Sequence, residues 1–169
     1  NGFSSYRVSH VKAASAQDVA VDDLNGDGFS DLIVAAYANA GSFETDSYVY
    51  WGSRAGITYD RPTKLPTSGA SGIAIADLNG DRQKDIVTVN KITGVAFAGE
   101  SSSSFAEPGF TTSWVYWGDD DGRLSPERRY GIRTVRGSDG YVNADFNYDG
   151  CTDLLFAQRA SDSVIFWGE

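Results

Sequence analysis

The sequence predicts an all-β fold, and three observations lead to that class. An acidic loop of nine residues occurs three times, at residues 23–31, 77–85 and 145–153. Short apolar segments flank the loops, and no segment has a sustained helical period. The 169 residues include 19 Gly, 9 Phe, 9 Tyr and 4 Trp, a composition that suits many short strands and turns around a folded core.

The repeated loop carries oxygen-bearing side chains at its positions 1, 3, 5 and 9. In each copy these are three carboxylates and one amide, and a backbone carbonyl at position 7 would complete the set. Side chains at alternate positions of a tightly curled loop converge, and an all-oxygen cluster suits calcium better than zinc or copper. The loops are therefore predicted calcium sites.

Two other interpretations of the loop were weighed. An EF-hand needs a Glu at position 12 and helices on both sides, but position 12 is Val34, Thr88 and Phe156, and residues 18–22 alternate as a strand does. A plain hairpin turn can also have such a sequence without binding metal. Three copies in one frame favour strand, calcium loop, strand.

Charge and hydropathy exclude some partners. The net charge of −9 argues against nucleic acid, which needs a basic face. No apolar run approaches the about 20 residues that span a bilayer, and no signal peptide is present, so we expect that any export signal has been removed. Cys151 is the single cysteine and cannot form an internal disulfide.

A second repeated signal sets the period of the chain. Each loop is followed by an aromatic-rich strand that ends in Trp-Gly, at residues 51–52, 117–118 and 167–168. A glycine opens a further strand in each unit, at Gly2, Gly56 and Gly122. The units are then 1–52, 53–118 and 119–169, and four strands per unit match the blade of a β-propeller.

The loops and the Trp-Gly strand resemble the FG-GAP repeat, which is found in the propeller of integrin α subunits and in many secreted bacterial proteins. The resemblance covers essentially the whole chain, although the Phe-Gly of the family is Trp-Gly here. It implies about three structural calcium ions and a secreted or cell-surface protein. The implied ligands are Asp23, Asn25, Asp27, the Phe29 carbonyl and Asp31; Asp77, Asn79, Asp81, the Gln83 carbonyl and Asp85; and Asp145, Asn147, Asp149, the Cys151 carbonyl and Asp153.

The second loop departs from the others at its sixth position. Gly28 and Gly150 occupy this position in the first and third loops, and Arg82 replaces them in the second. If the position needs a positive φ, a side chain there costs about 1 kcal/mol or more and places a cation near the ion. The second site is therefore predicted to be the weakest.

The N-terminal residues do not fit a complete first blade. In the register of the repeat, residues 2–12 are the fourth strand of a blade whose other strands are not upstream, and the last blade has only three strands. Because propellers have about four to eight blades, three are too few. We expect the missing strand to come from another chain, giving a six-bladed ring or a filament. The alternative is that the chain is part of a longer propeller.

The loops between the second and third strands differ most in length, and variable loops on a constant scaffold often carry function. The longest covers residues 91–112 and contains Phe97, Phe105 and Phe110. Candidate residues for binding a glycan or protein are Tyr37, Asn39, Phe43, Asn90, Lys91, Tyr141 and Arg159. The alternative is that the long loop packs its Phe residues on a neighbouring blade, or that its serine cluster at residues 101–104 forms a flexible, O-glycosylated bulge. We assign Trp51, Trp117 and Trp167 to packing between blades.

The sequence offers little for catalysis. His10 is the single histidine, and no Ser or Cys lies in a nucleophile motif. The leading hypothesis is a non-enzymatic, calcium-stabilised propeller module for adhesion or glycan or protein recognition. The second is a structural protein that assembles through its ends, and a polysaccharide-active enzyme is a remote third.

Overall fold

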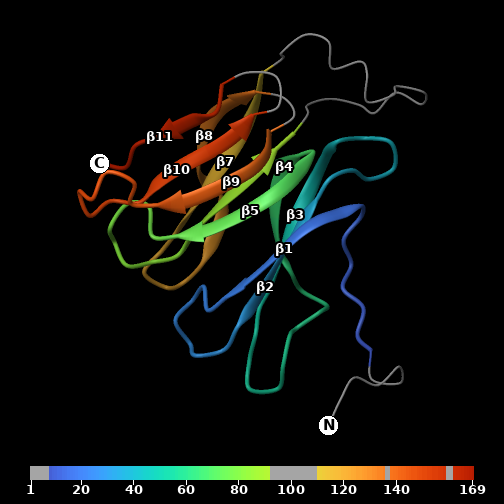
Figure 1. Ribbon diagram of the computed structural model, residues 1–169. Coiled ribbons are helices and arrows are strands. Elements are labelled where there is room, and N and C mark those ends of the chain that lie inside the picture. Colours follow the sequence, from blue (N-terminus) through green and yellow to red (C-terminus); the bar gives the residue numbers. More distant parts are fainter. Residues whose placement is uncertain (1–7, 92–109, 136–137, 159–161) are drawn as a thin grey trace.

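The computed structural model describes residues 8–91, 110–135, 138–158 and 162–169, and all regular elements in these residues are strands (Figure 1). They form three sheets, which confirms the all-β prediction. The first sheet contains β1 (Ala16–Asp22), β2 (Asp31–Ala36), β3 (Glu44–Tyr50) and β4 (Thr63–Ser68). The second contains β5 (Ala70–Ala76), β6 (Asp85–Asn90), β7 (Phe110–Gly118) and β8 (Leu124–Val135). The third contains β9 (Ser138–Ala144), β10 (Asp153–Gln158) and β11 (Val164–Phe166).

Within each sheet, strands adjacent in sequence pair antiparallel, so each sheet is a simple meander. The acidic loops connect β1 to β2, β5 to β6 and β9 to β10, with strands on both sides. This excludes the EF-hand alternative, which requires helices. Among the strands that the structure describes, the three sheets are separate and none closes on itself.

The structure differs from the sequence-based prediction at two of the predicted strands. Residues 56–62 are not a strand, because 51–58 form a closed turn in which Gly56 N–H donates to Ser53 O at 2.8 Å and Thr58 N–H to Trp51 O at 2.9 Å. Gly56 has a φ of +103°, outside the strand region. Of the predicted N-terminal strand 2–12, residues 8–12 are not in a strand and the rest lies outside the described residues.

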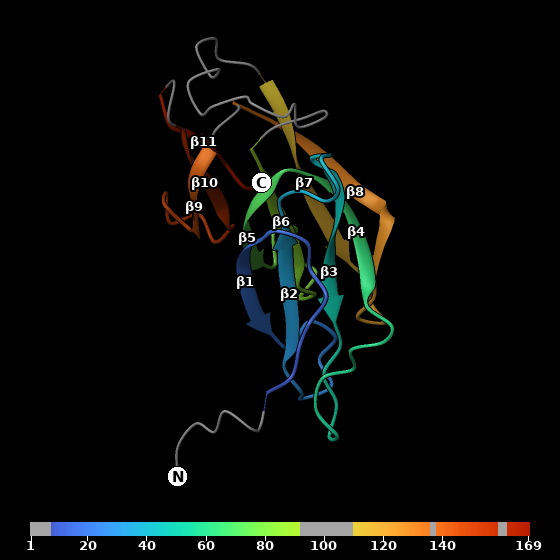
Figure 2. The ribbon, with the colours of Figure 1, turned by 90° about the vertical axis from the view of Figure 1, so that its right-hand side faces the viewer.

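The sheets pack face to face through two apolar clusters. Between the first and second sheets lie Leu24, Ile33, Ala35, Val49, Leu65, Ala70, Ile73, Ile86, Tyr116 and Leu124. Between the second and third lie Ala74, Val87, Val89, Val115, Ile132, Leu154 and Phe156. β5 of the second sheet contacts both β1 and β9, so the first strands of the three sheets lie side by side (Figure 2). This places the three acidic loops at corresponding ends of neighbouring sheets.

The described residues contain no helix that is long and apolar enough to cross a membrane. The long segment predicted as a candidate binding loop is described only at its ends, at residue 91 and from the start of β7. Phe97 and Phe105 lie outside the described residues.

Candidate metal centres

The first residue of each acidic loop binds the backbone of its own loop. In the first loop, Asp23 Oδ1 accepts a hydrogen bond from Asp27 N–H at 3.1 Å and Oδ2 accepts one from Gly28 N–H at 2.8 Å. The same two bonds join Asp145 to Asp149 (3.1 Å) and Gly150 (2.9 Å), while Asp77 accepts from Gly80 (2.8 Å) and Arg82 (2.8 Å). The first carboxylate therefore fixes the curl of each loop.

Positions 3 and 5 form a second repeated set of bonds. Asn25 Oδ1 accepts from Asp27 N–H at 3.0 Å, its Nδ2 donates to Asp27 Oδ2 at 3.1 Å, and Asp27 Oδ1 accepts from Phe29 N–H at 2.9 Å. The corresponding distances are 3.0, 2.9 and 2.7 Å in the second loop and 3.2, 2.7 and 2.8 Å in the third. All three loops thus share one conformation.

The carboxylate at position 9 joins the loop to the Trp-Gly turn of the same sheet. Asp31 is fully buried; its Oδ2 accepts from Leu24 N–H at 2.9 Å and its Oδ1 from Gly52 N–H at 2.7 Å. The same pairs join Asp85 to Leu78 (2.8 Å) and Gly118 (2.9 Å), and Asp153 to Phe146 (2.8 Å) and Gly168 (2.9 Å). Sequence reasoning identified the acidic loop and the Trp-Gly turn but did not predict the hydrogen bonds that join them. The constant order of the two motifs along the chain was a signal of this link.

The glycine of Trp-Gly is required by this contact. A Cβ on Gly52 would lie 2.2 Å from Ser30 O, and one on Gly118 would lie 2.6 Å from Lys84 O. Gly168 has the same restriction, at 2.6 Å from Thr152 O. A larger residue would push the turn away from the loop and separate its N–H from the buried carboxylate.

Burial and neighbouring charge raise the pKa of two of the buried carboxyl groups, those of Asp31 and Asp85. Burial raises the pKa of Asp31, the Asp27 and Asp23 carboxylates add to the rise, and the hydrogen bonds from Gly52 and Leu24 oppose it. The pKa of Asp85 is raised in the same way, with Asp81 and Asp77 as the neighbouring charges. Burial is therefore the main reason that these two carboxyl groups are harder to ionise, and the neighbouring carboxylates add to it.

The third loop contains the cysteine. Burial and the Asp149 carboxylate raise the pKa of the Cys151 thiol, whereas the Cys151 N–H and the Asn147 amide lower the pKa of Asp149. A thiol with a raised pKa is a weak nucleophile. This agrees with a role for Cys151 through its backbone alone.

The oxygen donors of the loops fit calcium in their chemistry. Within the described residues, however, no three His, Cys, Asp or Glu side chains are arranged around one ion position. The carboxylates at positions 1 and 5 instead accept from loop N–H groups. Calcium binding stays a prediction, and it requires these side chains to turn toward a common centre.

The sixth loop position does adopt a positive φ. Its value is +85° at Gly28, +70° at Arg82 and +92° at Gly150, as the glycines in the sequence suggested. The third loop has its own strained residue, because Tyr148 at position 4 has a φ of +64°. The second loop is therefore not alone in strain, but it alone carries a cationic residue at the sixth position.

The structure brings together some of the residues predicted to bind a ligand. Tyr37 and Phe43 stack edge to face with ring centroids 5.1 Å apart. Phe43 O accepts from Gly69 N–H, and Gly69 O accepts from Lys91 N–H, so Phe43 and Lys91 lie close across two sheets. Asn39 closes a tight turn with Ser42 in the same loop as Tyr37 and Phe43.

The other predicted ligand residues serve the interior or lie outside the described residues. Asn90 is fully buried and its Nδ2 donates to Thr112 O at 2.7 Å. Tyr141 donates through its hydroxyl to Asp18 Oδ2 at 2.8 Å, and burial followed by this bond raises the pKa of Tyr141 to about 12. Arg159 is not among the described residues. Asn90 and Tyr141 are thus engaged inside the fold.

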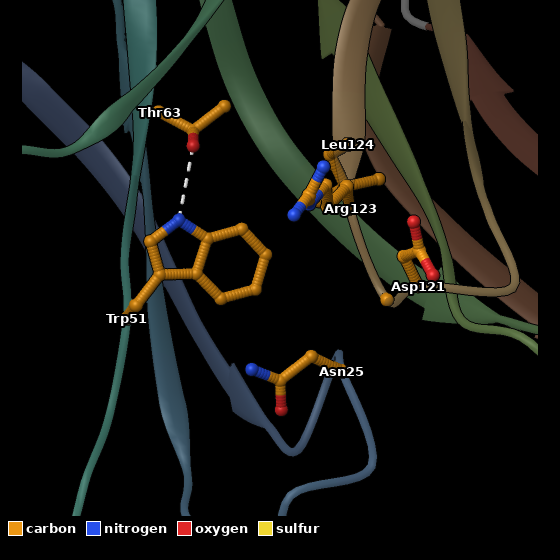
Figure 3. A pocket seen from close by; sticks show the side chains of 7 residues that line it. Asn25, Trp51, Thr63, Asp121, Arg123 and Leu124 are labelled. Carbon is orange, nitrogen blue, oxygen red and sulfur yellow. Dashed lines mark hydrogen bonds between the residues drawn. The ribbon is translucent and has the colours of Figure 1, made fainter.

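A cavity of about 380 Å³ lies beside the first acidic loop, between the first two sheets (Figure 3). The Trp51 ring faces it, with the indole N–H donating to Thr63 Oγ1 at 2.9 Å. The other lining residues are Asn25, Asp121, Gly122, Arg123 and Leu124. A Cβ on Gly122 would lie 2.4 Å from Asn25 Cα, so the turn between β7 and β8 rests directly on the acidic loop.

Comparison with known proteins agrees with the repeat. Residues 23–88 match the family model described as FG-GAP-like repeat. The matched range contains the first two acidic loops and the first Trp-Gly turn, and it confirms the resemblance predicted from the sequence. No curated protein and no solved structure matches the chain significantly.

Proposed function

The chain contains an FG-GAP-like repeat at residues 23–88, and from this premise we propose a calcium-binding β-propeller module that is secreted or displayed on a cell surface. Its role is non-enzymatic recognition of a glycan or protein. One observation carries the proposal: three acidic loops of one conformation, each fixed to the Trp-Gly turn of its own sheet by a buried carboxylate. FG-GAP repeats are typical of extracellular and surface proteins.

The ligands we propose for calcium are the oxygens at positions 1, 3, 5, 7 and 9 of each loop. Bound calcium would neutralise the carboxylates at positions 1 and 5, whose charge adds to the raised pKa of Asp31 and Asp85. The Asp at position 9 would carry this effect to the Trp-Gly turn, since its other contacts are backbone N–H groups of both segments. The role of the ion is therefore structural.

Isothermal titration calorimetry and thermal unfolding test this proposal. We expect about three calcium ions per chain with dissociation constants of about 10⁻⁴ to 10⁻³ M, the range of extracellular modules. Excess chelator should lower the melting temperature, while Asp60→Asn, an exposed acid outside the loops, should leave the calcium response unchanged. A melting temperature that chelator does not change would refute the calcium role.

We place the recognition site at the cavity beside the first loop. It combines the face of Trp51 with the Asn25 amide, the Asp121 carboxylate and the Arg123 guanidinium, and sugars bind to such combinations of an aromatic face and planar polar groups. A glycan array probed with the native chain and with Arg123→Ala tests this. Hits that disappear with Arg123→Ala but persist with Arg61→Ala, a control outside the cavity, would support the site; unchanged hits would refute it.

Self-assembly is the second candidate function. The third sheet has three strands where the other two have four, so the outer edge of β11 has no paired strand among the described residues. A homo-oligomer in which another copy completes this sheet would form a ring or a filament.

A further inference from the structure

The repeat assigns equivalent positions to the face by which one sheet packs on the next. In the first sheet this leading face includes Ala20, Leu24 and Trp51, and in the second it includes Ala74, Leu78 and Trp117. The equivalent residues of the third sheet, at the same distances from its loop and Trp-Gly turn, are Val142, Phe146 and Trp167. They are 51%, 37% and 55% exposed. The third sheet therefore presents an apolar leading face that no described residues cover.

The opposite face of each sheet, which we call the trailing face, packs against the sheet before it in the second and third sheets. On the first sheet this face is exposed. Ile73 and Ile75 of the second sheet pack against the first sheet. Tyr141 packs against the second sheet from the position equivalent to Ile73. In the first sheet the positions of Ile73 and Ile75 hold Val19 and Val21, which are 59% and 62% exposed. The first sheet thus has apolar residues in place for a preceding sheet.

Residues 8–13 already lie where the fourth strand of a preceding sheet would lie. The Tyr116 hydroxyl donates to Pro66 O in β4, and the Tyr50 hydroxyl donates to Lys12 O. Tyr50 and Tyr116 both directly precede Trp-Gly, and Lys12 precedes Pro66 by the same interval that separates the first two acidic loops. By this interval β4 corresponds to residues 9–14, so most of the segment 8–13 occupies the place of β4 without belonging to a sheet.

We propose that a second copy of this chain docks the leading face of its third sheet on the trailing face of the first sheet. Residues 8–13 of the first copy would then pair with β11 of the second and complete a four-stranded sheet. This inference rests on the proposed assembly function and names its surfaces. Each contact repeats one that already joins two sheets inside the chain, which is why a second copy fits as the partner.

The contact is heterologous, because different surfaces of the two copies meet. Figure 1 shows β11 at the upper left and the blue segment that includes residues 8–13 at the right, so the two segments that we propose to pair lie on different sides of one copy. Two copies would give six sheets, within the range of about four to eight found in closed propellers. The assembly is therefore a closed dimer with two such contacts.

Light scattering in calcium tests the proposal. The native chain should have twice its mass of 18.2 kDa. Val21→Asp and Val142→Asp each place a charge in one contact surface and should weaken dimerisation at least about 100-fold. Tyr59→Asp is a matched control, because Tyr59 is 43% exposed in the segment between β3 and β4 and is not among the residues of either surface, and it should stay dimeric. Circular dichroism should show that all three variants are folded.

Mixing the two variants distinguishes this contact from a symmetric one. Val21→Asp keeps an intact leading face and Val142→Asp an intact trailing face, so a mixture should regain one of the two contacts and form dimers. A folded native monomer, larger polymers, or a mixture that stays monomeric would overturn the proposal. Calcium binding is measured separately by calorimetry, so loss of the dimer with calcium binding retained would overturn only the assembly.

Discussion

Exchanging the residues at the sixth loop position tests the strain and the charge of the second loop. Arg82 has a φ of +70°, a conformation that costs an L-residue about 1–2 kcal/mol. Glycine would remove this strain but would lose about 0.5–1 kcal/mol through the greater freedom of the unfolded chain. Arg82→Gly should therefore stabilise the protein by about 0.5–1 kcal/mol.

The reciprocal change, Gly28→Arg, is the matched control in the first loop. A Cβ on Gly28 would meet no atom within 4 Å, so the cost is backbone strain without a clash. We expect a loss of about 0.5–1 kcal/mol, and Gly28→Ala should lose about as much because it adds the strain without the charge.

Thermal unfolding in chelator measures the strain apart from the ion. For a chain of this length, 1 kcal/mol corresponds to about 2–4 °C. Calorimetry in calcium then measures the charge: Arg82→Gly should strengthen the weakest of the three sites, and Gly28→Arg should weaken a site that Gly28→Ala leaves largely unchanged. An Arg82→Gly variant that is no more stable than the native chain, together with a neutral Gly28→Arg, would refute the reasoning.

Three further predictions follow from the contacts. Gly52→Ala should cost about 1–3 kcal/mol in urea unfolding, because the new Cβ would lie 2.2 Å from Ser30 O; a neutral result would contradict the docking of the turn. Asp31→Asn should destabilise by about 1–3 kcal/mol, since its amide N–H₂ would face a backbone donor, whereas an effect near zero would mean that the buried bonds contribute nothing. The raised pKa of Tyr141, about 12 against the usual 10.0, predicts stability that is fully present below pH 10 and lost as the pH rises toward 12. In urea unfolding across that range Tyr141→Phe should lose less stability than the native chain, keeping only the loss due to other groups such as Tyr50 and Tyr116, whose pKa values are also raised; a pH profile identical to that of the native chain would count against this role of Tyr141.

The sequence was sufficient to predict the order of strands in each sheet and the position of the loops. The alternation before the loop at 23–31, the apolar run after it and the spacing to Trp51 reflect local rules of strand and turn formation. The start of β4 could not be predicted in this way. It depends on hydrogen bonds that close the turn at 51–58, and the glycine at 56 signals a positive φ as readily as a strand.

Contacts between sheets were the part that sequence reasoning missed. Tyr141 offers an aromatic face and a hydroxyl, which suggested ligand binding, but its hydroxyl donates to Asp18 from a distant part of the chain. Trp51 was assigned to packing alone, yet its ring also faces a cavity. Neither outcome follows from spacing within one repeat, because both depend on which neighbouring sheet lies against the residue.

The buried carboxylate at position 9 connects the acidic loop to the stability of a whole sheet. Asp31 joins the loop between β1 and β2 to the turn that leads from β3 to β4, so both ends of the meander depend on one side chain. Charge that accumulates in the loop therefore acts on four strands, and an ion that neutralises it would stabilise all four together. Because Leu24 of the same loop packs into the cluster shared with the second sheet, this stabilisation would also extend across the interface. A calcium site in this position would support the repeat array as well as its own hairpin.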